Sequence, residues 1–152
     1  MKAILTIEAK ADEPAGQRIG NYWAEKRKST ERTRLPERID ELFLRAFGPT
    51  AKATQQPWSQ LRYQFLTATI GTITVARERR ANLAAFILYE IRSAALDQVL
   101  LSENARDYAR FVAMLGLSPE PQVRSGVLYG PVLFPENPDL KYYLGKAVRV
   151  LS

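Results

Sequence analysis

Residues 2–13 read KAILTIEAKADE, and this stretch sets the pattern from which the fold is predicted. Successive side chains of an extended strand point to opposite faces, so one face carries Ile4, Thr6, Glu8 and Lys10. The other face is wholly apolar and carries Ala3, Leu5, Ile7 and Ala9. We therefore expect a strand built for burial, with Glu8 and Lys10 emerging from the core into a cleft at its C-terminal end. The alternative is an ordinary strand end with a solvated Glu/Lys pair.

Four helices are expected, three before the next predicted strand and one after it. LPERIDELFLRAFG (35–48) has a proline where the first turn tolerates one, apolar residues at helical spacing and a closing glycine. A long helix is expected over 59–80 with Ser59 as its N-cap, and another from Ser102 to Gly116 with Ser102 as its N-cap. A short helix is also expected near Tyr22–Lys28.

Strand patterns occupy the remaining apolar segments. AAFILYEI (84–91) is an almost continuous apolar run, which is typical of a strand covered on both faces. Residues 125–134 and 140–151 flank the turn-rich PENPD and predict a closing β-hairpin. Strands and helices in this order predict an α/β fold, a β-sheet with helices packed on it. At 152 residues the chain is expected to be one domain, 1–152.

The composition excludes several kinds of chemistry. The chain has no cysteine and no histidine, so disulfides, thiolate metal sites and Ser-His or Cys-His catalysis are excluded. Any metal must be bound by oxygen, which favours Mg²⁺ or Mn²⁺ first and Ca²⁺ second. No apolar run approaches the length of a membrane span and no signal peptide is recognisable, so a soluble, cytoplasmic protein is expected.

An excess of basic residues points towards polyanions. Lys and Arg total 22 against 16 Asp and Glu, a formal net charge of +6. The densest basic cluster lies in the polar segment 11–34 and consists of Lys26, Arg27, Lys28, Arg32 and Arg34. It is either a phosphate-binding arm or a solvated face.

The motifs together resemble a known superfamily. IEAKADEPAG (7–16), followed by LRYQFLTATIGTITVARERRANLAAFILYEIRS (61–93), resembles an uncharacterised bacterial family whose members look like PD-(D/E)XK nucleases, the superfamily of restriction endonucleases. The resemblance covers most of the chain and implies a mixed β-sheet with a restriction-endonuclease-like core. It also implies that Glu8 is a metal ligand and that Lys10 positions and helps to activate the attacking water. Gln64, in LRYQ, would orient the nucleophile or a phosphate, or else be a capping or surface amide.

One part of the superfamily pattern has no counterpart here. The resemblance implies a preceding helix and strand with a metal-binding Asp, and the chain begins at the Glu-x-Lys strand itself. We therefore expect an N-terminally incomplete domain, or a second acid from elsewhere. Asp12 is the nearest substitute by face, followed by Glu13 and by Glu90 at the exit of the strand 84–91. A missing strand would leave an exposed sheet edge, so a homo-oligomer is a further expectation.

The expected function is that of a Mg²⁺- or Mn²⁺-dependent nuclease acting on phosphodiester bonds in DNA. Such chemistry is feasible because a carboxylate-held metal beside an ammonium can neutralise the phosphate and orient a water without histidine. Two alternatives remain: a catalytically inactive nuclease-like module that binds nucleic acid or protein, and a basic interaction domain whose Glu/Lys pair is structural.

Overall fold

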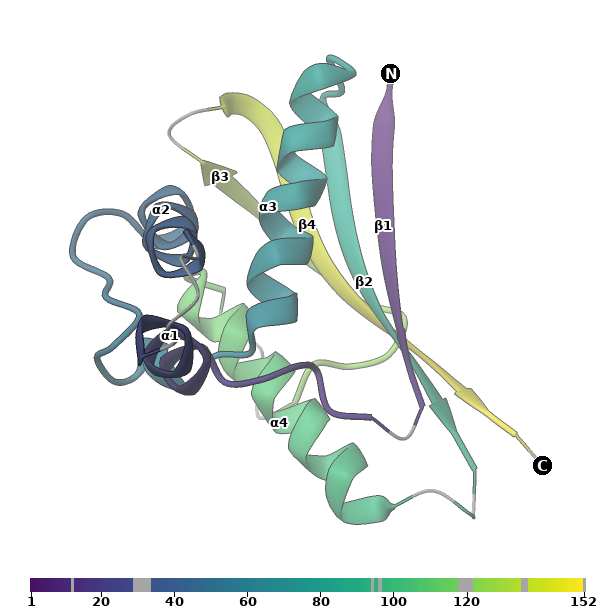
Figure 1. The fold of residues 1–152 in the computed structure, drawn as a ribbon. Helices are drawn as coiled ribbons and strands as arrows, with labels where there is room; N and C mark the ends of the chain where they lie inside the picture. Colours follow the sequence, from purple (N-terminus) through teal and green to yellow (C-terminus); the bar gives the residue numbers. More distant parts are fainter. Residues whose placement is uncertain are drawn as a thin grey trace.

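The computed structural model describes residues 1–11, 13–28, 34–93, 95, 97–117, 122–134 and 137–151. Within these residues, four strands form one sheet in the order β1-β2-β4-β3. The strands are β1 (Ala3–Lys10), β2 (Leu83–Arg92), β3 (Leu128–Phe134) and β4 (Asn137–Val150). Strands β1, β2 and β4 are parallel, and β3 is antiparallel to β4. The predicted α/β fold, a mixed sheet flanked by helices, is therefore confirmed (Figure 1).

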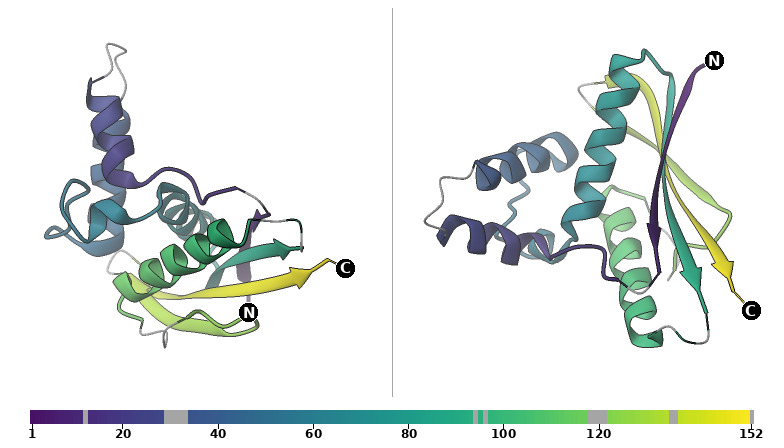
Figure 2. Two further views of the ribbon diagram at one scale, coloured as in Figure 1. Left: turned by 90° about the horizontal axis from the view of Figure 1, so that it is seen from below. Right: turned by 45° about the vertical axis from the view of Figure 1, so that its right-hand side comes forward.

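Five helical segments pack beside this sheet. They are α1 (Ile19–Lys28), α2 (Leu35–Phe47), the short 3-10 helix η1 (Trp58–Gln60), α3 (Tyr63–Glu78) and α4 (Gln98–Met114). Figures 1 and 2 show that the described helices lie on one face of the sheet and leave the other face uncovered. Helix α3 runs along the sheet, whereas α1 and α2 form a hairpin that projects away from it.

Strand β1 was expected to be buried, and the described helices cover only one of its faces. Its wholly apolar face lies on the open side of the sheet, where Leu5 is 60% exposed and Ile7 is 58% exposed. The face that carries Glu8 and Lys10 is the one turned towards the helices, and Lys10 is buried. Since the described helices cover one face only, the ionic half of the strand is enclosed and the apolar half lies on the open side.

Strand β2 was expected to be covered on both faces, and the helices that the structure describes lie over only one of them (Figure 1). Ala84, Phe86 and Leu88 are fully buried on that side. On the other side Ile87 and Tyr89 are half-buried, although neighbouring strands flank both residues. The continuous apolar pattern thus reflects a central strand whose second face is shielded by its neighbours alone.

Two predicted helix starts were wrong. Helix α3 begins at Tyr63 rather than after Ser59, because Leu61 and Arg62 have extended backbones. The backbone of Arg62 forms an isolated antiparallel β-bridge with that of Arg18. Helix α4 begins four residues before the predicted cap, since Asp97 is the N-cap. Its Oδ1 accepts hydrogen bonds from the backbone N–H groups of Val99 at 2.8 Å and Leu100 at 3.3 Å.

The core between sheet and helices is strongly aromatic. Phe65 of α3 lies between Phe86 of β2 and Tyr108 of α4, with ring centroids 6.4 and 5.1 Å away. Two buried phenols hold sheet and helices together: Tyr108 donates to Gly145 O at 2.8 Å, and Tyr142 donates to Thr69 Oγ1 at 2.9 Å. Burial raises the pKa of both phenols above the ordinary tyrosine value, so they are protonated donors at neutral pH.

Candidate functional site

The end of β1 brings Glu8 and Lys10 together as the alternation of side chains predicts. The Lys10 Nζ lies 3.0 Å from Glu8 Oε1. Lys10 is 3% exposed, whereas the Glu8 side chain is 33% exposed and reaches towards solvent. The ammonium is therefore enclosed and the carboxylate partly accessible, at the carboxyl end of a parallel strand, where ligand sites of α/β sheets gather.

A second carboxylate approaches the same ammonium from the segment after β1. Glu13 Oε1 lies 3.1 Å from Lys10 Nζ, and its side chain is 62% exposed. Asn104 of α4 holds the backbone of this segment, because its Nδ2 donates to Glu13 O at 2.9 Å and its Oδ1 accepts from Ala15 N at 3.2 Å. Helix α4 thus fixes the backbone from which Glu13 covers Lys10.

Glu90 is the register partner of Lys10 on the neighbouring strand, and its carboxylate has partners of its own. Glu90 is fully buried. Its Oε1 lies 2.6 Å from Lys146 Nζ of β4, and its Oε2 accepts from Arg92 at 2.6 and 2.9 Å. Both carboxylate oxygens face cations, so Glu90 is shared between Lys146 and Arg92. It is therefore not a carboxylate available to a metal ion beside Glu8.

Gln64 lies on the first turn of α3 and packs against Gly16 in the loop that follows β1. A Cβ placed on Gly16 would come within 2.9 Å of Gln64 Cγ, and Gly16 has a φ of +72°. A side chain at position 16 would be strained for both reasons. The Oε1 of Gln64 is buried and has no hydrogen-bond partner among the described residues.

A second ion-pair cluster, which the sequence analysis did not predict, lies behind this loop. Arg62 Nε donates to Asp107 Oδ2 at 2.6 Å, and both residues are buried. Arg62 Nη1 also donates to Gly16 O at 2.9 Å, and Arg18 Nη2 lies 3.8 Å from Asp107 Oδ2. Asn104 and Asp107 follow the same helical spacing as the buried apolar residues of α4. From the sequence, this spacing could have indicated that the two polar side chains face the core.

The carboxylates present allow a limited metal site. Among the described residues there is no cluster of three or more His, Cys, Asp or Glu side chains that could hold an ion. Glu8 and Glu13, which meet at one ammonium, are the accessible carboxylates here. Asp12, the predicted second ligand, lies outside the described residues. Because Mg²⁺ is commonly held by one or two carboxylates together with substrate phosphates, this donor pair is compatible with Mg²⁺.

The predicted basic cluster lies on the projecting helical hairpin. Lys26, Arg27 and Lys28 form the last turn of α1, and Arg34 precedes α2. Arg32 lies outside the described residues. The guanidinium of Arg27 lies 5.3 Å from the Trp23 ring centroid, and Lys26 Nζ lies 5.9 Å from the Tyr22 centroid.

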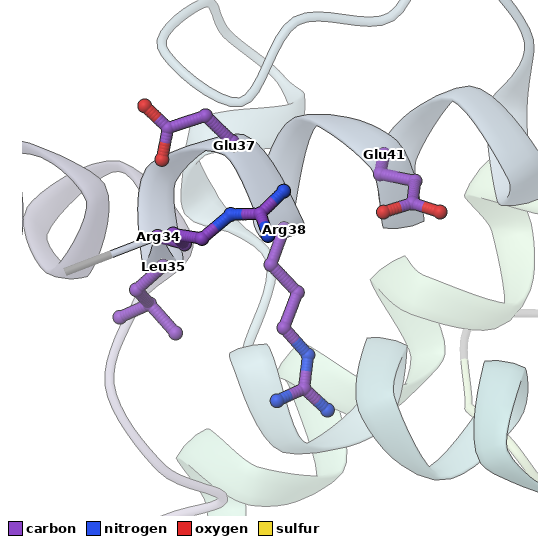
Figure 3. A pocket seen from close by; sticks show the side chains of 5 residues that line it. All are labelled: Arg34, Leu35, Glu37, Arg38 and Glu41. Atoms are coloured by element: carbon purple, nitrogen blue, oxygen red, sulfur yellow. The ribbon is translucent and has the colours of Figure 1, made fainter.

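A shallow depression on α2 adjoins this basic surface and is lined by two arginines and two glutamates with one leucine: Arg34, Arg38, Glu37, Glu41 and Leu35. Figure 3 shows Arg34 and Arg38 beside Leu35, with Glu37 pointing away from the Arg38 guanidinium. The outer end of the hairpin therefore presents cations from both of its helices. In Figure 2 this end lies away from the sheet and thus from the Glu8–Lys10 pair.

These features define a mixed α/β domain with an enclosed Glu-x-Lys pair at the end of a parallel strand and a basic helical hairpin. The chain belongs to the family described as a domain of unknown function, DUF6946, whose model matches residues 1–149. No curated protein and no solved structure matches the chain. Over the residues described, no helix has the length and apolar character needed to cross a membrane.

Proposed function

We propose that this domain is a metal-dependent, nuclease-like hydrolase of phosphodiester bonds, with DNA as its substrate in the cytoplasm. The observation that carries the proposal is the Lys10 ammonium, which is buried between the carboxylates of Glu8 and Glu13 at the end of a parallel strand. Phosphodiester hydrolysis requires an oriented water and compensation of the charge on the scissile phosphate. Carboxylates beside an ammonium can meet both requirements without histidine.

The two carboxylates and the ammonium have separate roles in this proposal. Glu8 and Glu13 would hold Mg²⁺ or Mn²⁺ together with oxygens of the substrate phosphate, and the bound ion would supply compensation of negative charge. Lys10 would donate a hydrogen bond to the attacking water. Because Glu13 is the more exposed of its two partners, movement of Glu13 away from Nζ would open Lys10 to that water. Asp12 is a candidate for a further ligand.

The surroundings would position these groups. Gln64 packs on Gly16, so it would act as a positioning residue for the segment that carries Glu13. Lys26, Arg27, Lys28 and Arg34 would contact backbone phosphates at a distance from the cleaved bond, with Arg32 as a further candidate. Such contacts position the nucleic acid without reading its sequence.

Replacement of Lys10 tests the proposed chemistry. We expect Lys10→Ala to reduce Mg²⁺-dependent cleavage of supercoiled plasmid DNA by about 100-fold or more, which is typical for loss of a group acting on the reacting water. The free energy of unfolding should fall by less than about 3 kcal/mol, since Lys10 is buried but the two carboxylates left behind can reach solvent. Glu8→Gln should also abolish cleavage. Lys141→Ala, at an exposed lysine of β4, is the matched control and should retain full activity.

The observation on Glu90 favours a second candidate, a module that binds nucleic acid or a protein partner without cutting. If the carboxylate of Glu90 is permanently committed to Lys146 and Arg92, few acidic ligands remain for a metal. Absence of cleavage with the native chain in Mg²⁺ and in Mn²⁺, together with retained DNA binding, would reject the hydrolase in favour of this module. Cleavage that Lys10→Ala leaves intact would instead reject the role given to Lys10.

A further inference from the structure

Strand β1 is an edge of the sheet, and its charged residues Glu8 and Lys10 are confined to its C-terminal end. It pairs with β2, and within the described residues no strand lies on its other side. Its eight residues contain no proline or glycine, and its ladder with β2 is unbroken in register. Leu5 and Ile7 are more than half exposed beside this edge. An edge strand of this length, with no proline or bulge and with exposed apolar side chains in its N-terminal part, can pair with another strand.

The backbone groups available at this edge can be identified. Asn82 N donates to Lys2 O at 3.1 Å, so the backbone of residue 2 faces the β2 side. Backbone groups alternate between the two edges of a strand, so the N–H and C=O groups of Ala3, Leu5 and Ile7 point to the free edge. These three residues can therefore form hydrogen bonds with another strand without disturbing the fold.

We infer that the occupant of this edge is β1 of a second copy, paired antiparallel about a two-fold axis at Leu5. In this register the two residue numbers of every directly opposed pair add up to ten. Leu5 faces Leu5 of the partner subunit, and Ala3 faces Ile7 of the partner subunit. On the helix side Lys2 faces Glu8 of the partner subunit, twice by symmetry. The two sheets would then form one continuous eight-stranded sheet.

Charge complementarity favours this register and a second copy as the occupant. Lys2 is exposed, and Glu8 contacts Lys10 through Oε1 while its other oxygen has no ion pair with the described residues. An opposite-charge pair across neighbouring strands stabilises them, and a like-charge pair destabilises them. In the next possible antiparallel register, the residue numbers of opposed pairs add up to twelve. That register would place Lys2 against Lys10 of the partner subunit. The register adding to ten avoids this repulsion and gains two ion pairs.

This arrangement would bring a residue of one subunit to the candidate site of the other. Lys2 of the partner subunit would contact the carboxylate of Glu8, beside the native Lys10. Six residue steps separate Glu8 from Lys2, so the two candidate sites would lie about 20 Å apart along the paired strands, on the same side of the joined sheet. The dimer does not depend on the proposed function, because it rests on the edge, the exposed side chains and the charges alone.

Crosslinking tests the position of the two-fold axis. The chain has no cysteine, so Leu5→Cys would introduce a single thiol. Directly opposed residues of a hydrogen-bonded antiparallel pair have Cα atoms about 5.5 Å apart, which suits a disulfide. We expect Leu5→Cys to form a disulfide-linked dimer under mild oxidation at least 10-fold faster than Val99→Cys, whose position on α4 is 71% exposed. Equal rates for the two variants would overturn the register.

Sedimentation equilibrium tests the dimer itself without a crosslink. The native chain should show a concentration-dependent dimer, and Leu5→Pro should be monomeric with unchanged circular dichroism, because proline is tolerated where an edge N–H points outward. Lys2→Glu should weaken association about 10-fold by placing like charges together, even if the proline variant fails to fold. A native chain that is monomeric at all concentrations, or association that Lys2→Glu leaves unchanged, would overturn the proposal.

Discussion

At the scale of single residues, Glu90 is the most enclosed charge in the candidate region. Its carboxylate lies between Lys146, which is also buried, and Arg92, which reaches solvent. Removing one member of a buried ion pair leaves the other charge without compensation in a poorly solvated place. Lys146 has no such access to solvent, so it should be the residue most affected by a change at position 90.

Replacement of Glu90 should therefore be strongly destabilising. We expect Glu90→Gln to lower the free energy of unfolding by about 3–5 kcal/mol in urea denaturation, whereas Glu90→Leu combined with Lys146→Met should recover much of this loss. Glu78→Gln, at an exposed carboxylate near the end of α3, is the control and should stay within about 0.5 kcal/mol. A Glu90→Gln protein as stable as this control would contradict the buried pairing.

The sequence predicted part of this residue-level picture. Alternation along β1 was enough to pair Glu8 with Lys10, because both residues lie on one strand and need no information about the rest of the fold. The partners of Glu90 were not predictable in this way. Lys146 reaches Glu90 only because β4 joins the sheet beside β2, and that pairing follows from the assembled topology.

At the scale of elements, helix and strand positions were predicted more reliably than the ends of the helices and the cover of the strands. Helix α2 begins and ends as its proline and glycine indicate. The exposure of Leu5 and Ile7 on β1 was not predicted, because the sequence of one strand does not determine which of its faces the helices cover. The start of α4 was misplaced because Asp97 and Ser102 are both good N-cap residues.

The two cap assignments for α4 make opposite predictions. Asp97→Ala should lower the free energy of unfolding by about 1 kcal/mol, because two backbone N–H groups lose their acceptor. Ser102→Ala should change it by less than about 0.5 kcal/mol, since the Ser102 hydroxyl only donates to the helical carbonyl of Gln98. Thermal denaturation of both variants measures this difference. A larger effect at Ser102 would restore the sequence-based assignment.

At the scale of the whole molecule, charge and candidate chemistry occupy different regions. The Glu8–Lys10 pair lies at the end of a sheet strand, and the basic cluster lies at the far end of the α1–α2 hairpin (Figure 2). This separation could not be predicted from the sequence, because both features fall within the first 34 residues. A nucleic acid that touches both regions must extend along the molecule.

Salt dependence should locate the phosphate contacts on the hairpin. Lys26→Gln, Arg27→Gln and Lys28→Gln together should lower the slope of log Kobs against log salt concentration by about 2–3, since each lost phosphate contact removes about 0.9. Arg77→Gln, Arg79→Gln and Arg80→Gln remove the same charge from the exposed end of α3 and should change the slope by less than about 1. Equal effects of both triple variants, measured by fluorescence anisotropy of labelled DNA, would remove the hairpin from the interface.

The hairpin also contains a natural optical reporter. The chain has two tryptophans, and they lie in α1 (Trp23) and in the adjoining η1 (Trp58), so the sheet contributes nothing to tryptophan emission. The Arg27 guanidinium rests over the Trp23 ring, and a phosphate that draws this cation away would alter the surroundings of the indole. Both indoles pack against the core, but it is the Trp23 ring that the Arg27 guanidinium covers, so Trp58 would serve as an internal reference. Occupation of the hairpin could thus be followed in the unlabelled, unmodified protein.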